Sequence, residues 1–171
     1  MFVLQRTTQM TDIQKIDNEI AKLANEHKLI ADYVAKFSKG KSQKDKAFFS
    51  NLQSFFQFLK KDLLRHFELE ELVIFPAAVN GAPSYETTLA VLHLQKDHGR
   101  LENQFNQLLG RESEMAPQKL NASLVKEMGN FFENLKNHAK YELTELFPAI
   151  DQHNQCKNLI EQYLDDLQSK P

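Results

Sequence analysis

From residue 66 the chain reads His66-Phe-Glu-Leu-Glu70-Glu-Leu-Val-Ile-Phe75-Pro76-Ala77, and a related stretch reads His138-Ala-Lys-Tyr-Glu142-Leu-Thr-Glu-Leu-Phe147-Pro148-Ala149. The offset is 72 at the shared positions, since 138 − 66, 142 − 70 and 147 − 75 all give that value. Both copies keep a histidine and, four residues later, a glutamate. Residues that only pack a core can drift between two copies, so a retained imidazole and carboxylate indicate a shared metal site.

Each copy is preceded by a further histidine in a similar setting. His27 follows Asn25-Glu26 and His98 follows Lys96-Asp97, with an offset of 71. The spacing to the next histidine is 39 residues from His27 and 40 from His98. Two helical hairpins of nearly equal length would therefore bring all four histidines to one level of a bundle.

Apolar residues recur at spacings of three and four, which is the period of amphipathic helices, and no segment alternates as a strand would. We expect four long helices and a shorter one, at about residues 12–37, 45–75, 85–109, 117–147 and 150–167. Short connections between long helices favour antiparallel neighbours. The predicted fold is all-α: an antiparallel up-down-up-down four-helix bundle with a short C-terminal extra helix, in a single domain of residues 1–171.

The expected helix ends follow from capping residues and breakers. Thr11 or Asp12 would cap the first helix, and Ser84 would cap the third. Proline cannot continue the hydrogen-bond ladder, so Pro76 and Pro148 would end the second and fourth helices. Pro117 suits the first turn of the fourth helix.

Composition restricts the partners. The 171 residues carry a formal net charge of −2, which gives no electrostatic reason to expect nucleic-acid binding. The single cysteine, Cys156, excludes an intramolecular disulfide and a cysteine-rich metal site, and it suits a reducing compartment. The first residues lack the layout of a signal peptide, and no apolar run approaches the roughly 20 residues of a membrane span. We therefore expect a soluble cytoplasmic protein with neither nucleic acid nor membrane as a partner.

Helical spacing turns the repeated motif into a candidate metal site. Positions i and i+4 lie about 40° apart around a helix, so each histidine and its glutamate would project from one stripe. Buried together without a ligand, these polar groups would cost several kcal/mol. We expect six inward-facing metal ligands: His27, His66, Glu70, His98, His138 and Glu142. Imidazole with carboxylate suits iron, manganese or zinc, and two shared carboxylates suit a pair of metals.

Other metal and catalytic patterns are absent from the sequence. There is no His-Glu-x-x-His of a zinc protease and no Glu-x-x-His of the ferritin-like di-iron bundles. Two further carboxylates stay open as extra ligands, Glu145 at i+7 from His138 and Glu102 at i+4 from His98. We expect Glu26, Glu71 and Asp97 to face outward or to pair with lysines.

The motifs His-Phe-x-x-Glu-Glu-x-x-x-Phe-Pro and Glu-His-x-Leu resemble those of the hemerythrin-like, or HHE-type, cation-binding domains, over roughly residues 27–148. In that family a four-helix bundle holds an oxo-bridged di-iron centre. The resemblance implies two histidines for each iron and two bridging glutamates: His27 and His66, His98 and His138, and Glu70 with Glu142.

The chain departs from the oxygen-carrying members of that family. Those have a third histidine one turn before the ligand of the third helix, where this chain has Leu94, and Leu23 is its counterpart. The fourth-helix carboxylate is a glutamate at i+4, whereas the carriers have an aspartate at i+5. The symmetric ligand set resembles the bacterial repair-of-iron-centres proteins more closely. Those also carry a Cys-containing N-terminal domain, and the sequence shows nothing of that kind.

We therefore expect a non-haem di-iron protein that binds or senses O₂, NO or peroxide in a protective stress response, rather than a catalyst. One alternative is iron donation to a protein acceptor, as in the repair of damaged iron–sulfur centres. A second is a di-iron peroxidase, although no long loop is present that would shape a substrate pocket. The sequence leaves the oligomeric state open.

Overall fold

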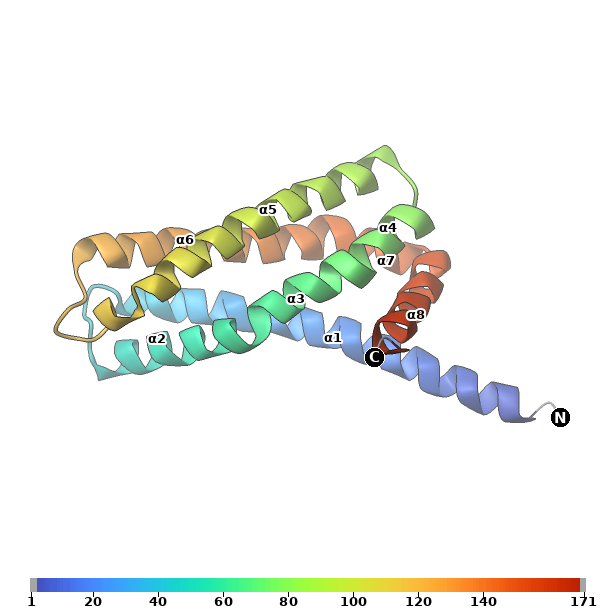
Figure 1. The fold of residues 1–171 in the computed structure, drawn as a ribbon, viewed down its shortest axis with the longest axis horizontal. Helices are drawn as coiled ribbons and strands as arrows, with labels where there is room; N and C mark the ends of the chain where they lie inside the picture. The colour runs from blue at the N-terminus through green and yellow to red at the C-terminus, as the bar shows by residue number, and fades with distance from the viewer. Residues whose placement is uncertain (1–2, 170–171) are drawn as a thin grey trace.

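The computed structural model of this chain describes residues 3–169, and the surroundings of its side chains from residue 18 onward. All regular structure in that range is helical, and four long rods run antiparallel to their neighbours along the chain (Figure 1). The first rod is α1 (Val3–Gly40) and the third is α5 (Tyr85–Gly110). This confirms the predicted all-α, up-down-up-down four-helix bundle.

The second and fourth rods are built from several helical segments in unbroken succession. The second comprises α2 (Lys46–Phe58), the π-helical η1 (Leu59–Leu63), α3 (Leu64–Leu69), the π-helical η2 (Glu70–Ile74) and α4 (Phe75–Gly81). The fourth comprises α6 (Ala122–Tyr141), the π-helical η4 (Glu142–Leu146) and α7 (Phe147–Gln152). A short 3₁₀ turn, η3 (Glu112–Glu114), and the C-terminal α8 (Asn154–Ser169) complete the fold.

The prediction that proline ends the second and fourth helices is wrong. Before each proline lies a π-helical turn, in which the N–H of Phe75 donates to the carbonyl of Glu70 and that of Phe147 to Glu142. Pro76 and Pro148 then stand in the first turn of α4 and α7. A proline is tolerated in a first turn because its missing N–H is not needed for the ladder there.

The first, fourth and last helices also begin at other residues than predicted. The first helix begins at Val3, so Thr11 and Asp12 lie within it; their side chains are outside the described residues. No proline or glycine interrupts residues 3–11, so nothing stops the helix from continuing towards the N-terminus. The last helix begins at Asn154, because the chain becomes extended at His153. The predicted cap at Ser84 is confirmed: its Oγ accepts from the N–H of Thr87 at 3.0 Å.

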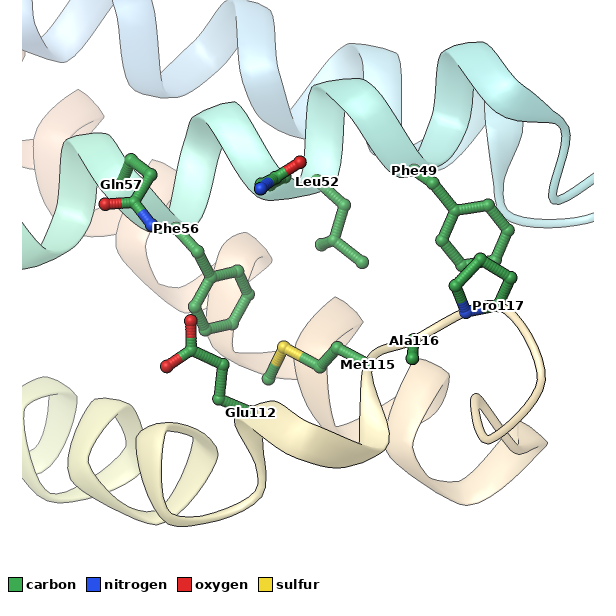
Figure 2. A pocket seen from close by; sticks show the side chains of 9 residues that line it. Phe49, Leu52, Phe56, Gln57, Glu112, Met115, Ala116 and Pro117 are labelled. Carbon is green, nitrogen blue, oxygen red and sulfur yellow. The ribbon is translucent and has the colours of Figure 1, made fainter.

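The fourth rod begins at Ala122 rather than at Pro117. Asn121 caps it, since its Oδ1 accepts from the N–H of Leu124 at 2.9 Å. The preceding connection packs on α2 around a hollow of about 250 Å³, and Met115 points across it towards Phe56 (Figure 2). None of the six predicted metal ligands lines this hollow.

Two separate groups of buried apolar side chains make up the core. The phenylalanine cluster holds the half of the bundle that contains α2 and includes Phe37, Phe55, Phe105, Phe131 and Phe132. The α8 cluster fills the other half, where α8 crosses the end of the bundle, and includes Leu23, Phe75, Leu94, Cys156 and Ile160. Within the part of the chain described, no helix is both long enough and apolar enough to cross a membrane.

Candidate metal centre

Each long rod contributes one histidine to the layer between the two apolar clusters. His27 comes from α1, His66 from α3, His98 from α5 and His138 from α6, and each is at most 5% exposed. Along α1, His27 stands between Leu23 of the α8 cluster and Ile30 of the phenylalanine cluster. Equal hairpin lengths therefore bring the four imidazoles to one level, as their spacing in the sequence predicts.

The two glutamates of the repeated motif, fully buried, lie in the same layer. Glu70 opens η2 and Glu142 opens η4, so each carboxylate stands at the start of a π-helical turn. π-Turns inside α-helices are frequent at functional sites. Sequence reasoning missed these turns. A signal for them was present, since Pro76 and Pro148 each lie six residues after the glutamate, inside an apolar pattern that continues past the proline.

The six side chains form two groups of possible metal ligands that share both glutamates. In one group Glu70 and Glu142 join His27 and His66, and in the other they join His98 and His138. All candidate ligand atoms within a group lie within 4.8 Å of one another.

The carboxylates are oriented towards both groups at once. Glu142 Oε2 is 2.7 Å from His27 Nε2, and its other oxygen, Oε1, is 2.7 Å from His138 Nε2. Glu70 Oε1 is 3.0 Å from His66 Nε2, and Oε2 is 3.2 Å from His98 Nε2. Each glutamate therefore presents one oxygen to each histidine pair, which is the arrangement that a bridging carboxylate requires.

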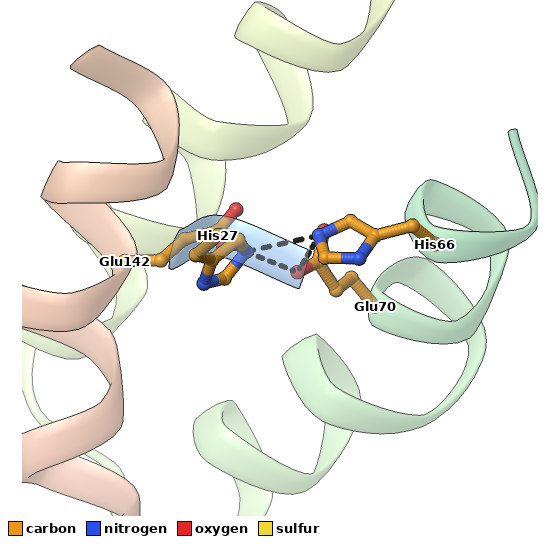
Figure 3. A group of neighbouring side chains, drawn as sticks. All are labelled: His27, His66, Glu70 and Glu142. Atoms are coloured by element: carbon orange, nitrogen blue, oxygen red, sulfur yellow. Dashed lines mark hydrogen bonds and ion pairs between the residues drawn. The ribbon is translucent and has the colours of Figure 1, made fainter. Parts of the chain in front are cut away.

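Within each pair the two imidazoles point at each other. Nε2 of His27 is 3.0 Å from Nε2 of His66, and the same two atoms of His98 and His138 are 3.1 Å apart. Figure 3 shows the first pair with Glu70 between them and Glu142 beside His27. Nitrogen atoms that converge in this way, together with carboxylate oxygens, define a common point for a cation.

A metal fits this layer because its polar atoms are poorly satisfied without one. Within the described residues, none of the four oxygens of Glu70 and Glu142 has an aligned hydrogen bond, although imidazole nitrogens lie close by. Buried oxygens left in this state cost free energy, and coordination to a cation removes that cost. The donor set of imidazole and carboxylate suits iron, manganese or zinc.

The pKa shifts show that the layer attracts positive charge. Burial would lower the pKa of His66, but the charge of Glu70 and the contact with Glu26 raise it to about 10. Burial would raise the pKa of Glu70, but His66 and the neighbouring imidazoles hold it well below its usual range. The buried carboxylate of Glu70 thus favours a proton on His66, and a metal cation would supply the same positive charge.

Further carboxylates contact the outer nitrogens of two histidines. Glu26 Oε2 is 2.6 Å from His66 Nδ1, and Glu71 Oε1 is 2.9 Å from His98 Nδ1. The prediction that Glu26 faces outward or pairs with a lysine is therefore wrong, whereas Glu71 is exposed as predicted and also contacts His98. Asp97 comes within 3.9 Å of His138 Nδ1, which is too long for a hydrogen bond. The Nδ1 atoms of His138 and His27 therefore have no hydrogen-bond partner among the described residues. Hydrogen bonds to a carboxylate, as at His66 and His98, orient a ligating imidazole and increase its basicity.

The remaining candidates stay outside the layer. Glu102 and Glu145 are both exposed, and neither belongs to the two ligand groups found among the described residues. Leu23 and Leu94, which stand where the oxygen carriers of the family would have a third histidine, are buried in the α8 cluster. Apolar side chains therefore occupy these two positions.

A helical bundle with a buried layer of histidines and shared carboxylates is the architecture of a metal-binding protein. The family model of the hemerythrin HHE cation-binding domain matches residues 18–150, and the chain belongs to that family. No curated protein and no solved structure gives a significant match.

Proposed function

We propose that this protein is a non-haem di-iron protein that binds O₂, NO or peroxide in a sensing or protective role. The observation that carries the proposal is the double orientation of Glu70 and Glu142, each with one oxygen towards each histidine pair. Two shared carboxylates favour two metal ions over one. His27 and His66 would hold the first iron, and His98 and His138 the second.

Each iron would have two imidazoles and two carboxylate oxygens from the protein, fewer donors than a six-coordinate ion takes, so bound iron would supply open positions and redox chemistry. Among the described residues, no further ligand-type side chain joins the two groups. Leu23 and Leu94 are fully buried beside the layer and contribute no ligand atom. A small, weakly polar molecule suits such an apolar setting better than a charged substrate does.

The direct test is metal content followed by spectroscopy. We expect about two irons per chain after anaerobic loading with Fe(II), and a change in the absorption spectrum when O₂, NO or peroxide is added. Two irons without any spectral response would contradict the proposal. Sustained turnover of peroxide would instead assign the same site to a peroxidase.

A second candidate is iron donation to a protein acceptor, and one feature of the surface favours it. His66 lines a small hollow at the edge of the bundle, where the carboxylates of Glu19, Glu26 and Asp62 outnumber the two basic side chains, Lys22 and Arg65. Carboxylates between a buried ligand and solvent would give a departing Fe(II) ion successive oxygen ligands. Rapid iron transfer to an apoprotein acceptor would support this function, whereas retention of both irons in its presence would contradict it.

A further inference from the structure

The outer face of α5 carries a row of large apolar side chains that the described residues leave exposed. Tyr85, Leu89 and Leu92 are 74%, 46% and 56% exposed, and they follow one another at spacings of four and three residues. Residues at these spacings lie on one face of a helix. The other face of α5 is buried against the bundle, of which α5 forms one edge (Figure 1).

The remaining exposed leucines among the described residues are dispersed. Two of them stand on the second rod, eight residues apart, and the first and fourth rods have one each: Leu64, Leu72, Leu29 and Leu143. Single exposed leucines are common on soluble proteins, whereas a contiguous apolar patch marks a contact surface. The row on α5 is therefore the part of the described surface that most needs an occupant.

Charged residues stand at the two ends of this row. Lys96 continues it four residues beyond Leu92, and Glu86 borders it beside Tyr85. Spacings of four, three and four residues are those of a helix–helix seam. Because the two charges are opposite in sign and lie at opposite ends, the face is complementary to itself: a two-fold axis would bring each end against the opposite end of a second copy.

An antiparallel pair of α5 helices matches these residues. When Leu89 of one copy lies level with Leu92 of the other, Lys96 lies level with Tyr85, because each of the two residues is four positions further along its own helix. The Lys96 ammonium would then be near the Tyr85 ring and the Glu86 carboxylate of the second copy, and both attract a cation. A parallel pair would instead place like residues together, with Lys96 against Lys96.

We propose that the outer stripe of α5, formed by Tyr85, Leu89, Leu92 and Lys96, binds a second copy of this chain as an antiparallel helix pair around a two-fold axis. The leucines make the apolar centre, and the Lys96–Glu86 pair, formed twice, sets direction and register. One helix from each copy makes a small interface, so the dimer is weak and reversible. The stripe faces solvent whereas His98 of α5 is buried, so the inference does not depend on the proposed metal.

Sedimentation velocity of the whole chain at about 1 μM to about 1 mM protein tests the proposal. We expect a reversible monomer–dimer equilibrium with and without metal. Leu89→Asp should weaken self-association at least about tenfold, because it removes apolar contact at the centre and buries a charge there. Leu64→Asp is the matched control: Leu64, on α3, is equally exposed at 46%, and its change should leave the equilibrium as in wild type.

Charge reversal tests the direction and register of the pair. Glu86→Lys would meet Lys96 of the second copy, and Lys96→Glu would meet Glu86, so each variant alone should associate about tenfold more weakly than wild type. An equimolar mixture of the two variants should recover the dimer, because every end contact then joins a lysine to a glutamate. A wild type that stays monomeric over the whole range, a dimer that Leu89→Asp leaves intact, or a mixture that stays monomeric would each overturn the proposal.

Discussion

At the scale of single residues, the layer of four buried histidines contains two glutamates whose burial needs a physical explanation. Glu70 and Glu142 are fully buried, and their neighbours within reach are imidazoles. A buried carboxylate is strongly unfavourable unless a positive charge balances it. Their retention in both copies of the motif is therefore best explained by what they bind.

The first prediction concerns Glu142→Gln, with Glu145→Gln as the matched control in the same π-helical segment. The amide keeps the shape of the carboxylate but loses its charge, so metal content should fall from about two ions per chain to below one. Glu145 is exposed and outside both ligand groups, so its amide should leave metal content unchanged. Elemental analysis of both purified variants checks this, and equal metal content in both would contradict the assignment of Glu142.

A second residue-scale prediction concerns Cys156, a buried residue of α8 that packs against Gly81 at the end of the second rod. Burial raises the pKa of its thiol, so little thiolate forms near neutral pH, and the side chain is also inaccessible. A thiol reagent should label the native protein far more slowly than the unfolded protein. Rapid labelling of the native state would show that α8 detaches from the bundle.

At the scale of helices, the contact between α4 and α8 depends on a glycine. A Cβ placed on Gly81 would lie 2.6 Å from the backbone nitrogen and 2.7 Å from the Cα of Cys156. Backbone atoms cannot move aside as the end of a flexible side chain can. Gly81 therefore allows the two helices to approach closely enough for α8 to cover its apolar cluster.

Gly81→Ala should consequently destabilise the fold by about 1–3 kcal/mol through overpacking. Gly99→Ala is the control, since Gly99 lies within α5 and its added Cβ would have nothing within 4 Å. That change should stabilise the helix by roughly 0.5–1 kcal/mol. Urea unfolding of the metal-free proteins measures both, and equal midpoints for Gly81→Ala and wild type would contradict the close approach.

The helices also show where prediction from the sequence failed, namely at two of the helix ends. Periodicity located all four rods, because an amphipathic pattern is a property of neighbouring residues. Pro76 and Pro148 were expected to end helices because proline breaks the regular ladder, but a single wider turn before each one accommodates it. The apolar pattern that continues past each proline was the signal for such a turn, but the rule that proline ends a helix does not take it into account.

At the scale of the whole molecule, the layer of four histidines and two glutamates separates the two apolar clusters and takes side chains from all four rods. Binding a metal there should stabilise the fold, because the unfolded chain does not bring the six side chains together. At a free metal concentration of 100 times Kd, the gain is about 2.7 kcal/mol for each site. Thermal melts with and without Fe(II) under anaerobic conditions should show a clear rise in Tm.

The Glu142→Gln variant is the control for these thermal melts. Its Tm should be nearly the same with and without Fe(II). A rise in Tm equal to that of wild type would mean that the metal stabilises the chain from somewhere else. No rise in wild type would contradict the metal-binding role of the layer.

The spacing of residues along single helices was sufficient to predict the bundle and the six residues that meet in its middle. His66 and Glu70 share a stripe by helical geometry alone, and two hairpins of nearly equal length place the four histidines at one level. That the six side chains ligate metal stays a prediction, supported by their convergence and by the family to which the chain belongs.

What spacing could not predict are contacts between residues of different rods. Glu26 and Glu71 lie beside His66 and His98, yet each is an ordinary charged residue within its own helix. Nor does spacing indicate that the Nδ1 atoms of His27 and His138 lack a hydrogen-bond partner among the described residues. Position along one helix is set by local geometry, whereas the partner across the bundle is set by how four rods rotate and pack together, and that is a property of the tertiary structure.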